Sequence, residues 1–242
     1  MTRHQLQGRT EEEVLWFQRR SALKAGAAWV AMGGFSAAMA QQSGNVVELA
    51  GDALVNGARL LTGQTIQTGD RIQTGPGSRL VFVLGNASFL VRQNTMMTVE
   101  RGRSLNAVSV LRILTGAVAS VWNKGADRTI VTPTITAGIR GTGVYTEVMP
   151  PGDGRSYFCN CYGTVELAAG SSRTLSQAEH HQSFWSVPVA ANPHLTPGQQ
   201  SAFTLAPAQF LNHTDEELEF LAGLIGQRTA WQITGIKTST GY

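Results

Sequence analysis

The fold is decided by the stretch Arg79-Leu80-Val81-Phe82-Val83-Leu84-Gly85-Asn86-Ala87-Ser88-Phe89-Leu90-Val91-Arg92. Arg79 is followed by the apolar run Leu80-Val81-Phe82-Val83-Leu84, which predicts a buried strand. Gly85-Asn86 is a turn dipeptide, so Ser88–Arg92 is predicted to return as the second strand of a hairpin. A strand, a turn and a return strand in so few residues indicate a β-sheet protein.

The same pattern extends to both sides of this hairpin, from Val46 to about Leu167. Short runs of residues that fit a pleated surface alternate with glycines and other turn formers. Further strands are predicted at 46–49, 59–62, 64–67, 71–74, 108–114, 117–122, 129–131, 135–139, 143–148, 157–162 and 164–168. Thr115-Gly116 predicts another hairpin turn. We therefore expect an all-β fold of twisted antiparallel hairpins, stacked as a solenoid-like arrangement or a sandwich.

The character of the sequence changes after Gly170. Residues 188–207 contain four prolines and few periodic apolar positions, which predicts an irregular connector. Thr214-Asp215-Glu216-Glu217 matches a capping box, apolar residues follow at helical spacing, and Gly226 suits a helix end. We expect a short C-terminal helix at about 214–226, packed on its own domain or on a partner.

The first 40 residues have the pattern of an export signal. Arg19 and Arg20 precede a mildly apolar run, residues 25–39, and the segment ends in Ala38-Met39-Ala40. A positive region, an apolar region and a small-x-small site are the parts of a removable signal peptide, and paired arginines are typical of twin-arginine (Tat) export. The alternatives are an amphipathic helix or an uncleaved anchor, but an anchor needs about 20 apolar residues. We expect cleavage after Ala40 and a periplasmic protein.

Removal of the predicted signal peptide lowers the net charge of the chain. The whole chain has a formal charge of +3, and residues 1–40 hold five basic against three acidic residues, so the remainder carries about +1. That charge is not the dense basic patch that a nucleic acid or an acidic membrane would need. No other segment is apolar enough to span a bilayer. The expected organisation is a signal at 1–40, a β-domain at 41–170, and a connector with its helix at 171–242.

Several motifs, in order, resemble the FecR-domain family. They are the entry hairpins at Leu61–Gly75, Leu114-Thr115-Gly116-Ala117-Val118, Ile139-Arg140-Gly141-Thr142, and the strand Gly163-Thr164-Val165-Glu166-Leu167. The resemblance covers about residues 46–170 and implies a non-catalytic extracytoplasmic β-domain. In the regulators that named the family, such a domain relays receptor occupancy to a cytoplasmic sigma factor.

The resemblance leads to an expected function as a periplasmic sensor or scaffold that binds an envelope protein or a cell-wall polymer. Its contact surface is expected at the sheet edges and the Pro150–Arg155 loop. Direct control of a sigma factor is not expected, because the export signal stands where those regulators have a cytoplasmic domain and a membrane helix.

The motif Gly138, Ile139, Arg140, Gly141 and Thr142 is predicted to be a structural corner rather than a catalytic site. Its two glycines allow a positive φ or a close approach between strands. Burying Arg140 without a partner would be costly, so we expect it to reach solvent or to pair with a carboxylate or backbone carbonyls.

The two cysteines lie together in Tyr157-Phe158-Cys159-Asn160-Cys161-Tyr162. In a strand, Cys159 and Cys161 share one face, with roughly 6–7 Å between their β-carbons. A disulfide needs about 3.5–4.5 Å, so bridging them would require a bulge or a turn. Three interpretations stay open: buried structural thiols, a strained or intermolecular disulfide, or a metal or haem-type site.

A metal site would need two further ligands. His180 and His181 are the nearest candidates, and His194 and His213 are weaker ones. This metal- or redox-active protein is the alternative to the sensor or scaffold, for which no cofactor is expected. The chain has no G-x-S-x-G elbow, phosphate loop or H-E-x-x-H motif, and a helix start explains its densest acidic cluster. We expect no enzyme.

Overall fold

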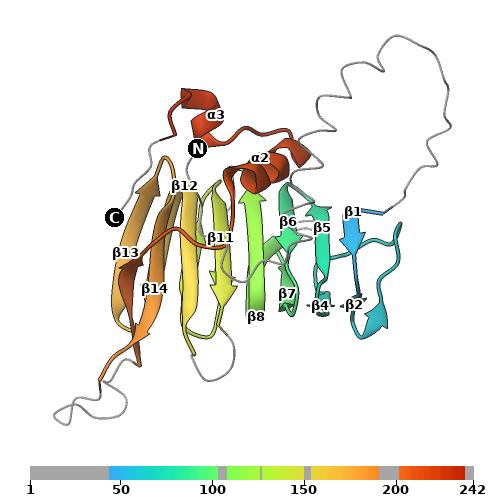
Figure 1. The fold of residues 1–242 in the computed structure, drawn as a ribbon, viewed down its shortest axis with the longest axis horizontal. Helices are drawn as coiled ribbons and strands as arrows, with labels where there is room; N and C mark the ends of the chain where they lie inside the picture. The colour runs from blue at the N-terminus through green and yellow to red at the C-terminus, as the bar shows by residue number, and fades with distance from the viewer. Residues whose placement is uncertain (1–43, 103–107, 126, 150–153, 191–201, 238–242) are drawn as a thin grey trace.

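The computed structural model describes residues 44–102, 108–125, 127–149, 154–190 and 202–237. These residues form fifteen strands and two short C-terminal helices (Figure 1), which confirms the predicted all-β fold. The predicted signal residues Arg19, Arg20, Ala38 and Ala40 lie outside the described residues. Within the described part of the chain, no helix has the length and apolar character needed to cross a membrane.

The strands form two sheets that share two long strands, β8 and β12. Sheet A contains, in pairing order, β1 (Val46–Ala50), β5 (Arg79–Leu84), β6 (Ala87–Val91), β8 (Val108–Trp122), β11 (Gly143–Val148), β12 (Ser156–Ala169), β14 (Gln182–Pro188) and β15 (Phe203–Ala208). Sheet B contains β3 (Ala58–Arg59), β2 (Ala53–Val55), β4 (Arg71–Thr74), β7 (Met96–Arg101), β8, β9 (Arg128–Val131), β10 (Thr136–Ile139), β12 and β13 (Ser172–Ala178). The pair β8–β9 is parallel and the other pairs are antiparallel. The predicted hairpin at 79–92 is confirmed as β5 and β6.

Both shared strands cross between the sheets at a glycine. Strand β8 leaves sheet B for sheet A at Gly116, where φ is 76°, and β12 makes the reverse passage at Gly163, where φ is 96°. Glycine takes a positive φ without the steric cost of a β-carbon. The predicted hairpin at Thr115-Gly116 is therefore wrong: the glycine bends one continuous strand, and the sequence signals of a bend and a turn are alike.

We expect Gly116→Ala to lower the free energy of unfolding by about 3 kcal/mol. The new β-carbon would stand 2.5 Å from the Thr95 Cα, in a backbone held at φ +76°. Gly57→Ala is the matched control, since Gly57 also has a positive φ of +83° but no atom within 4 Å of its β-carbon position. It is expected to lose about 1 kcal/mol. Denaturant unfolding measures both, and equal losses would contradict a steric role for Thr95.

Three strands lie where the sequence predicted an irregular connector. Strand β13 extends sheet B beside β12, and β14 and β15 extend sheet A. The connector interpretation is therefore wrong for residues 172–188 and 203–208. The prolines of this segment suggested irregular structure. However, Pro188 ends β14 and Pro207 lies on the edge strand β15, where a missing N–H is tolerated. Predicted strands at 59–62 and 64–67 are also wrong, apart from Arg59 at the end of β3.

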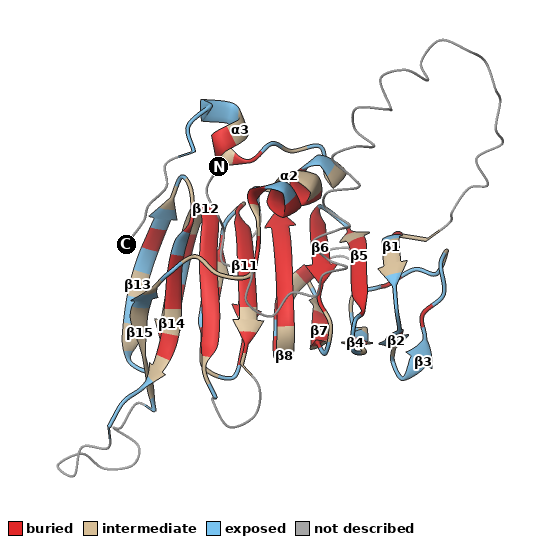
Figure 2. Ribbon diagram, in the orientation of Figure 1, coloured by how far each residue is buried: buried red, intermediate tan, exposed pale blue. Residues whose placement is uncertain are grey.

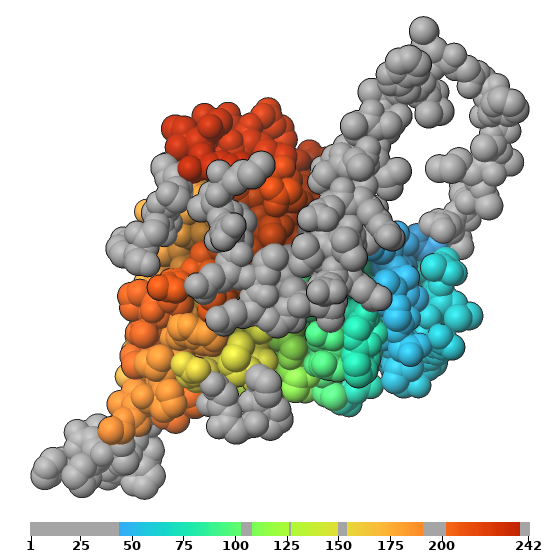
Figure 3. All heavy atoms as spheres, viewed as in Figure 1, coloured from blue at the N-terminus to red at the C-terminus, as the bar shows by residue number. Residues whose placement is uncertain are grey.

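The predicted C-terminal helix is confirmed as α2 (Asp215–Leu224). Thr214 is its N-cap, and the Thr214 and Glu217 side chains form the expected capping box. A further short helix, α3 (Ala230–Thr234), follows. We call residues 209–237 the C-terminal layer. Helix α2 packs on β6 and β8 of the same domain and lies at their upper ends in Figure 1, and the visible part of the layer is red at the top of Figure 3.

Two separate apolar cores result. The first lies between the two sheets and joins residues such as Phe82 and Trp122 of sheet A to Leu111 and Ile130 of sheet B. The second lies between the outer face of sheet A and the C-terminal layer. Its members include Tyr145, Tyr157, Cys159, Cys161, Leu218, Leu221 and Trp231. The central strands are accordingly buried along most of their length (Figure 2), and both cysteines lie in the second core.

Candidate metal centre

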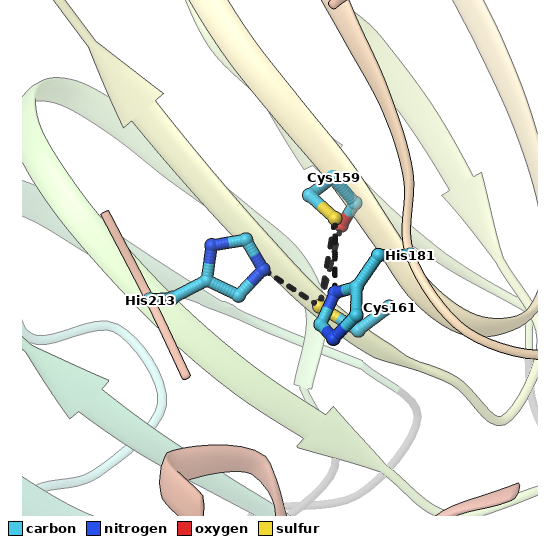
Figure 4. Close-up of side chains that lie close together, drawn as sticks. All are labelled: Cys159, Cys161, His181 and His213. Carbon is cyan, nitrogen blue, oxygen red and sulfur yellow. Dashed lines mark hydrogen bonds between the residues drawn. The ribbon is translucent and has the colours of Figure 1, made fainter. Parts of the chain in front are cut away.

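Four side chains with soft or nitrogen donors converge in the second core: Cys159, Cys161, His181 and His213 (Figure 4). All four are buried, and their donor atoms lie within 4.8 Å of one another. The two Sγ atoms are 3.9 Å apart. The Cys159 Sγ is 3.5 Å from the His181 Nδ1, and the Cys161 Sγ is 3.4 Å from the His213 Nε2.

Three different elements bring these donors together. Alternation along β12 turns Cys159 and Cys161 to the outer face of sheet A, as the sequence predicted. His181 lies in the turn between β13 and β14 with φ 48°, and its backbone N–H donates to the Cys161 carbonyl at 2.9 Å. His213 immediately precedes Thr214, the N-cap of α2. The C-terminal layer thus supplies one donor and the strands and their turn supply three.

The distances fit the edges of a tetrahedron around one metal ion. Zinc binds cysteine sulfur at about 2.3 Å and histidine nitrogen at about 2.0–2.1 Å. A tetrahedron with these arms has a sulfur–sulfur edge of about 3.8 Å and sulfur–nitrogen edges of about 3.6 Å. Three of the six edges are observed at 3.9, 3.5 and 3.4 Å, close to these values, and the other donor pairs lie within 4.8 Å of one another.

Outer hydrogen bonds turn the correct nitrogen of each imidazole toward the sulfurs. His213 Nδ1 lies 2.6 Å from the Leu211 carbonyl, and His181 Nε2 lies 2.7 Å from Asp215 Oδ1. Both partners only accept, so each of these nitrogens carries a proton. The remaining nitrogens, His213 Nε2 and His181 Nδ1, are the ones that face the cysteines. Metal-binding histidines are oriented in this way by a carbonyl or a carboxylate.

Asp215 connects several groups around the cluster. Its Oδ1 also accepts from His180 Nε2 at 3.0 Å, and its Oδ2 lies 3.0 Å from the Lys237 ammonium. Although burial acts to raise it, the pKa of Asp215 is well below its ordinary value because of these hydrogen bonds. His180, His181 and Asp215 also lie close enough to share an ion. However, Lys237 already places a positive charge on that carboxylate, so we assign Asp215 to the outer shell of the four-donor cluster.

The protonation states prepare a thiolate in this cluster. Burial acts to raise the pKa of Cys159, but the hydrogen bond with Cys161 and the His213 and His181 imidazoles hold it well below its ordinary value. Burial and the Cys159 contact raise the pKa of Cys161. Burial acts to lower the pKa of His181, but Asp215 and Cys159 raise it to about 9, and burial lowers the pKa of His213. A bound cation would take the place of protons on these donors.

Aromatic rings close the cluster off from water. Tyr145 stacks on His213 with ring centroids 4.5 Å apart, and Phe210 lies 4.2 Å from His181. Trp231 of α3 packs against both His180 and His181, at 5.0 and 5.4 Å. A cluster enclosed by four donors and by rings leaves no open position for a substrate, which is the arrangement of structural rather than catalytic metal sites.

The structure sorts the residues that the sequence offered. It brings Cys159, Cys161 and His181 together, and it replaces the expected His180 by His213, which was a weaker candidate. Both cysteines are free thiols. Their sulfurs are 3.9 Å apart against about 2.05 Å in a disulfide, and their burial keeps them from bridging to another chain. His194 lies outside the described residues.

One residue of the cluster's surroundings, Asp215, escaped sequence reasoning altogether. It had been explained as part of the acidic start of a helix, which it also is. The two histidines of the cluster, His181 and His213, come from positions far apart in the chain. Only the presence of His213 directly before the capping box, two residues from Asp215, could have drawn attention to Asp215.

The motif at 138–142 lies at the corner between the two sheets. Gly138 and Ile139 end β10 in sheet B, and β11 of sheet A begins at Gly143. Arg140 is exposed and pairs with Asp127 at 3.1 Å, as expected for a cation that meets a carboxylate. Gly141 has φ 66°, and Thr142 is fully buried. Residues 150–153 of the expected contact loop lie outside the described residues.

Comparisons with known proteins give little more. No protein-family model matches the chain, and no curated protein does. Two crystal structures of a candidate anti-sigma factor from Parabacteroides distasonis ATCC 8503 are similar, with TM-scores of 0.44 and 0.43 and sequence identities of 11% and 10%. The matches cover 66% and 64% of this chain and 66% and 65% of those chains, just under two thirds of their length. The FecR-domain resemblance stays a prediction.

Proposed function

We propose that this protein is a non-catalytic β-domain that binds one thiophilic metal ion, Zn²⁺, through Cys159, Cys161, His181 and His213. The observation that carries the proposal is the convergence of two sulfur and two nitrogen donors within 4.8 Å of one another, with three donor pairs at distances close to tetrahedral edges.

The donor set favours zinc. Thiolate sulfur selects Zn²⁺, Cu⁺ and iron–sulfur clusters, and a tetrahedral site with two sulfurs and two nitrogens is typical of zinc. The enclosure that aromatic rings give the four ligands supports a structural role over a catalytic one. A haem, which takes axial ligands on opposite faces of a flat ring, does not suit four donors within 4.8 Å of one another.

The proposal keeps the wider role expected from the sequence. We take the protein to be a periplasmic sensor or scaffold whose β-sandwich binds an envelope protein or a cell-wall polymer. The Tat-type signal and the FecR-like motifs support this setting. The metal centre then serves to hold the C-terminal layer against the sandwich rather than to perform a reaction.

Metal analysis of the full chain, purified under reducing conditions, tests the proposal. We expect one equivalent of zinc per chain, and none in the Cys159→Ser/Cys161→Ser variant, which keeps the size of both side chains. Because structural zinc contributes to folding, a chelator is expected to lower the melting temperature of the unaltered protein and to leave that of the variant unchanged. No bound metal, even after zinc is added, would overturn the proposal, and one equivalent of copper or iron would overturn only the choice of metal.

A further inference from the structure

We propose that the metal ion fastens the C-terminal layer to sheet A, and that without the ion this layer opens as a unit while the β-sandwich stays folded. The inference rests on the proposed function and adds a regulatory consequence to it. Metal availability would set how often the outer face of sheet A is exposed.

The four ligands are divided between the β-sandwich and the C-terminal layer. Cys159 and Cys161 lie on β12, and His181 lies in the turn between β13 and β14, so three ligands belong to the sandwich. His213 alone comes from the C-terminal layer, and its neighbour Asp215 supplies the hydrogen bond that orients His181. When the layer leaves the sheet, both groups leave with it. The ion can therefore be held by all four ligands only in the closed arrangement.

The C-terminal layer is attached to sheet A without strand pairing. Among the described residues the layer contains helices and loops but no strand. Its contacts with the sheet run through side chains: Ser88 donates to the Leu221 carbonyl at 2.7 Å, and Tyr157 donates to the Gln209 carbonyl at 3.0 Å. Opening would break such contacts without breaking a ladder of the sheets.

The β-sandwich has a core of its own, separate from the one beneath the layer. The core between the two sheets lies on the inner face of sheet A and includes no residue of the C-terminal layer. The layer packs on the opposite face, where Val81, Leu90 and Tyr145 are each fully buried beneath it. Opening would expose this face but would leave the first core intact, which is the condition for a local opening below the global one.

Linkage then sets the size of the effect. The open form keeps three ligands but loses His213 and the Asp215 hydrogen bond to His181, so it is expected to bind zinc more than about 1,000-fold less tightly. At a free zinc concentration 100 times Kd, zinc therefore binds almost only the closed form and makes opening rarer by the factor 1 + [L]/Kd, about 100-fold. The same coupling is reciprocal, so whatever binds the exposed sheet face would weaken zinc binding by an equal factor. The centre would in this way convert zinc occupancy into exposure of an apolar surface.

Hydrogen exchange of the full chain, read by mass spectrometry with and without free zinc, tests the inference. With free zinc at 100 times Kd, we expect exchange in α2 and α3 to slow about 100-fold, while β9 and β10 of sheet B change little. The His213→Gln variant should lose this zinc effect. Glu216→Ala, at an exposed position in the first turn of α2, should keep it.

Zinc content measured on the same samples separates the possible failures. If zinc binds at one equivalent but slows the layer and sheet B by the same factor, the chain opens only as a whole, and the inference is overturned while the proposed function stands. If zinc binds but slows hydrogen exchange in neither the layer nor sheet B, the layer is held closed without zinc. The inference is then overturned while the proposed function stands. If no zinc binds, both proposals fail.

Discussion

Replacement of His213 by glutamine is expected to weaken zinc binding about 100-fold or more, whereas His180→Ala keeps one tightly bound equivalent. Structural zinc sites bind with roughly 10–16 kcal/mol in all, so each of four ligands accounts for about 3 kcal/mol, or about 100-fold in affinity. The comparison matters because the sequence points to His180 and the fold points to His213.

The geometry explains why the two histidines should differ. His213 Nε2 lies 3.4 Å from the Cys161 Sγ, with its other nitrogen held by the Leu211 carbonyl. His180 Nε2 is turned to Asp215 at 3.0 Å, and His180 takes no part in the four-donor cluster. Since Asp215, the direct partner of His181, stays in place when His180 is replaced, the loss in zinc affinity is expected to stay below the roughly 10-fold that losing such a direct partner costs at least.

Competition with a coloured zinc chelator measures both affinities. Glutamine is close to histidine in size, which limits disturbance of the Tyr145 ring stacked on His213, and circular dichroism of the variant checks that the sheets remain. Tight binding by His213→Gln together with loss of zinc from His180→Ala would show that the sequence-based choice of ligand was the correct one.

The second large effect is expected at Glu217, where alanine should lower the free energy of unfolding by about 3–5 kcal/mol. Its carboxylate is fully buried and accepts from the Arg92 guanidinium at 2.8 and 2.9 Å. It also accepts from the Thr214 backbone N–H at 3.0 Å, completing the capping box of α2. Removing it leaves a buried guanidinium without its main counter-charge and removes the Glu217 half of the capping box.

Denaturant unfolding of three variants isolates this effect. Glu216→Ala, one residue away and exposed, should change the unfolding free energy by no more than about 0.5 kcal/mol. The Arg92→Met/Glu217→Leu pair should recover part of the stability, because apolar groups of similar volume can replace a buried ion pair. The recovery should be incomplete, because the buried Arg79 guanidinium, 3.9 Å from the Glu217 carboxylate, keeps Glu48 but loses Glu217. A loss at Glu217 no larger than that at Glu216 would show that the buried pair contributes nothing to attachment of the layer.

Some elements of the fold could be predicted from the sequence, and others could not. The hairpin at 79–92 and the helix begun by Thr214 were predictable, because each depends on neighbours a few positions apart. The strands β13, β14 and β15 were missed, since their place depends on pairing with the distant β12 and with each other. Gly116 was predicted to lie in a hairpin turn, because a glycine in the sequence gives no sign of whether the chain reverses or bends there.

The sequence by itself determined the β class, the capped helix, and the placing of Cys159 and Cys161 on one face, because all three follow from the periodicity of a strand or a helix. The tertiary structure alone decided which histidine joins them. Cys161 and His213 are 52 positions apart, and Arg92 and Glu217 are 125 apart. Contacts at such separations depend on how whole layers pack, which no local pattern of residues specifies.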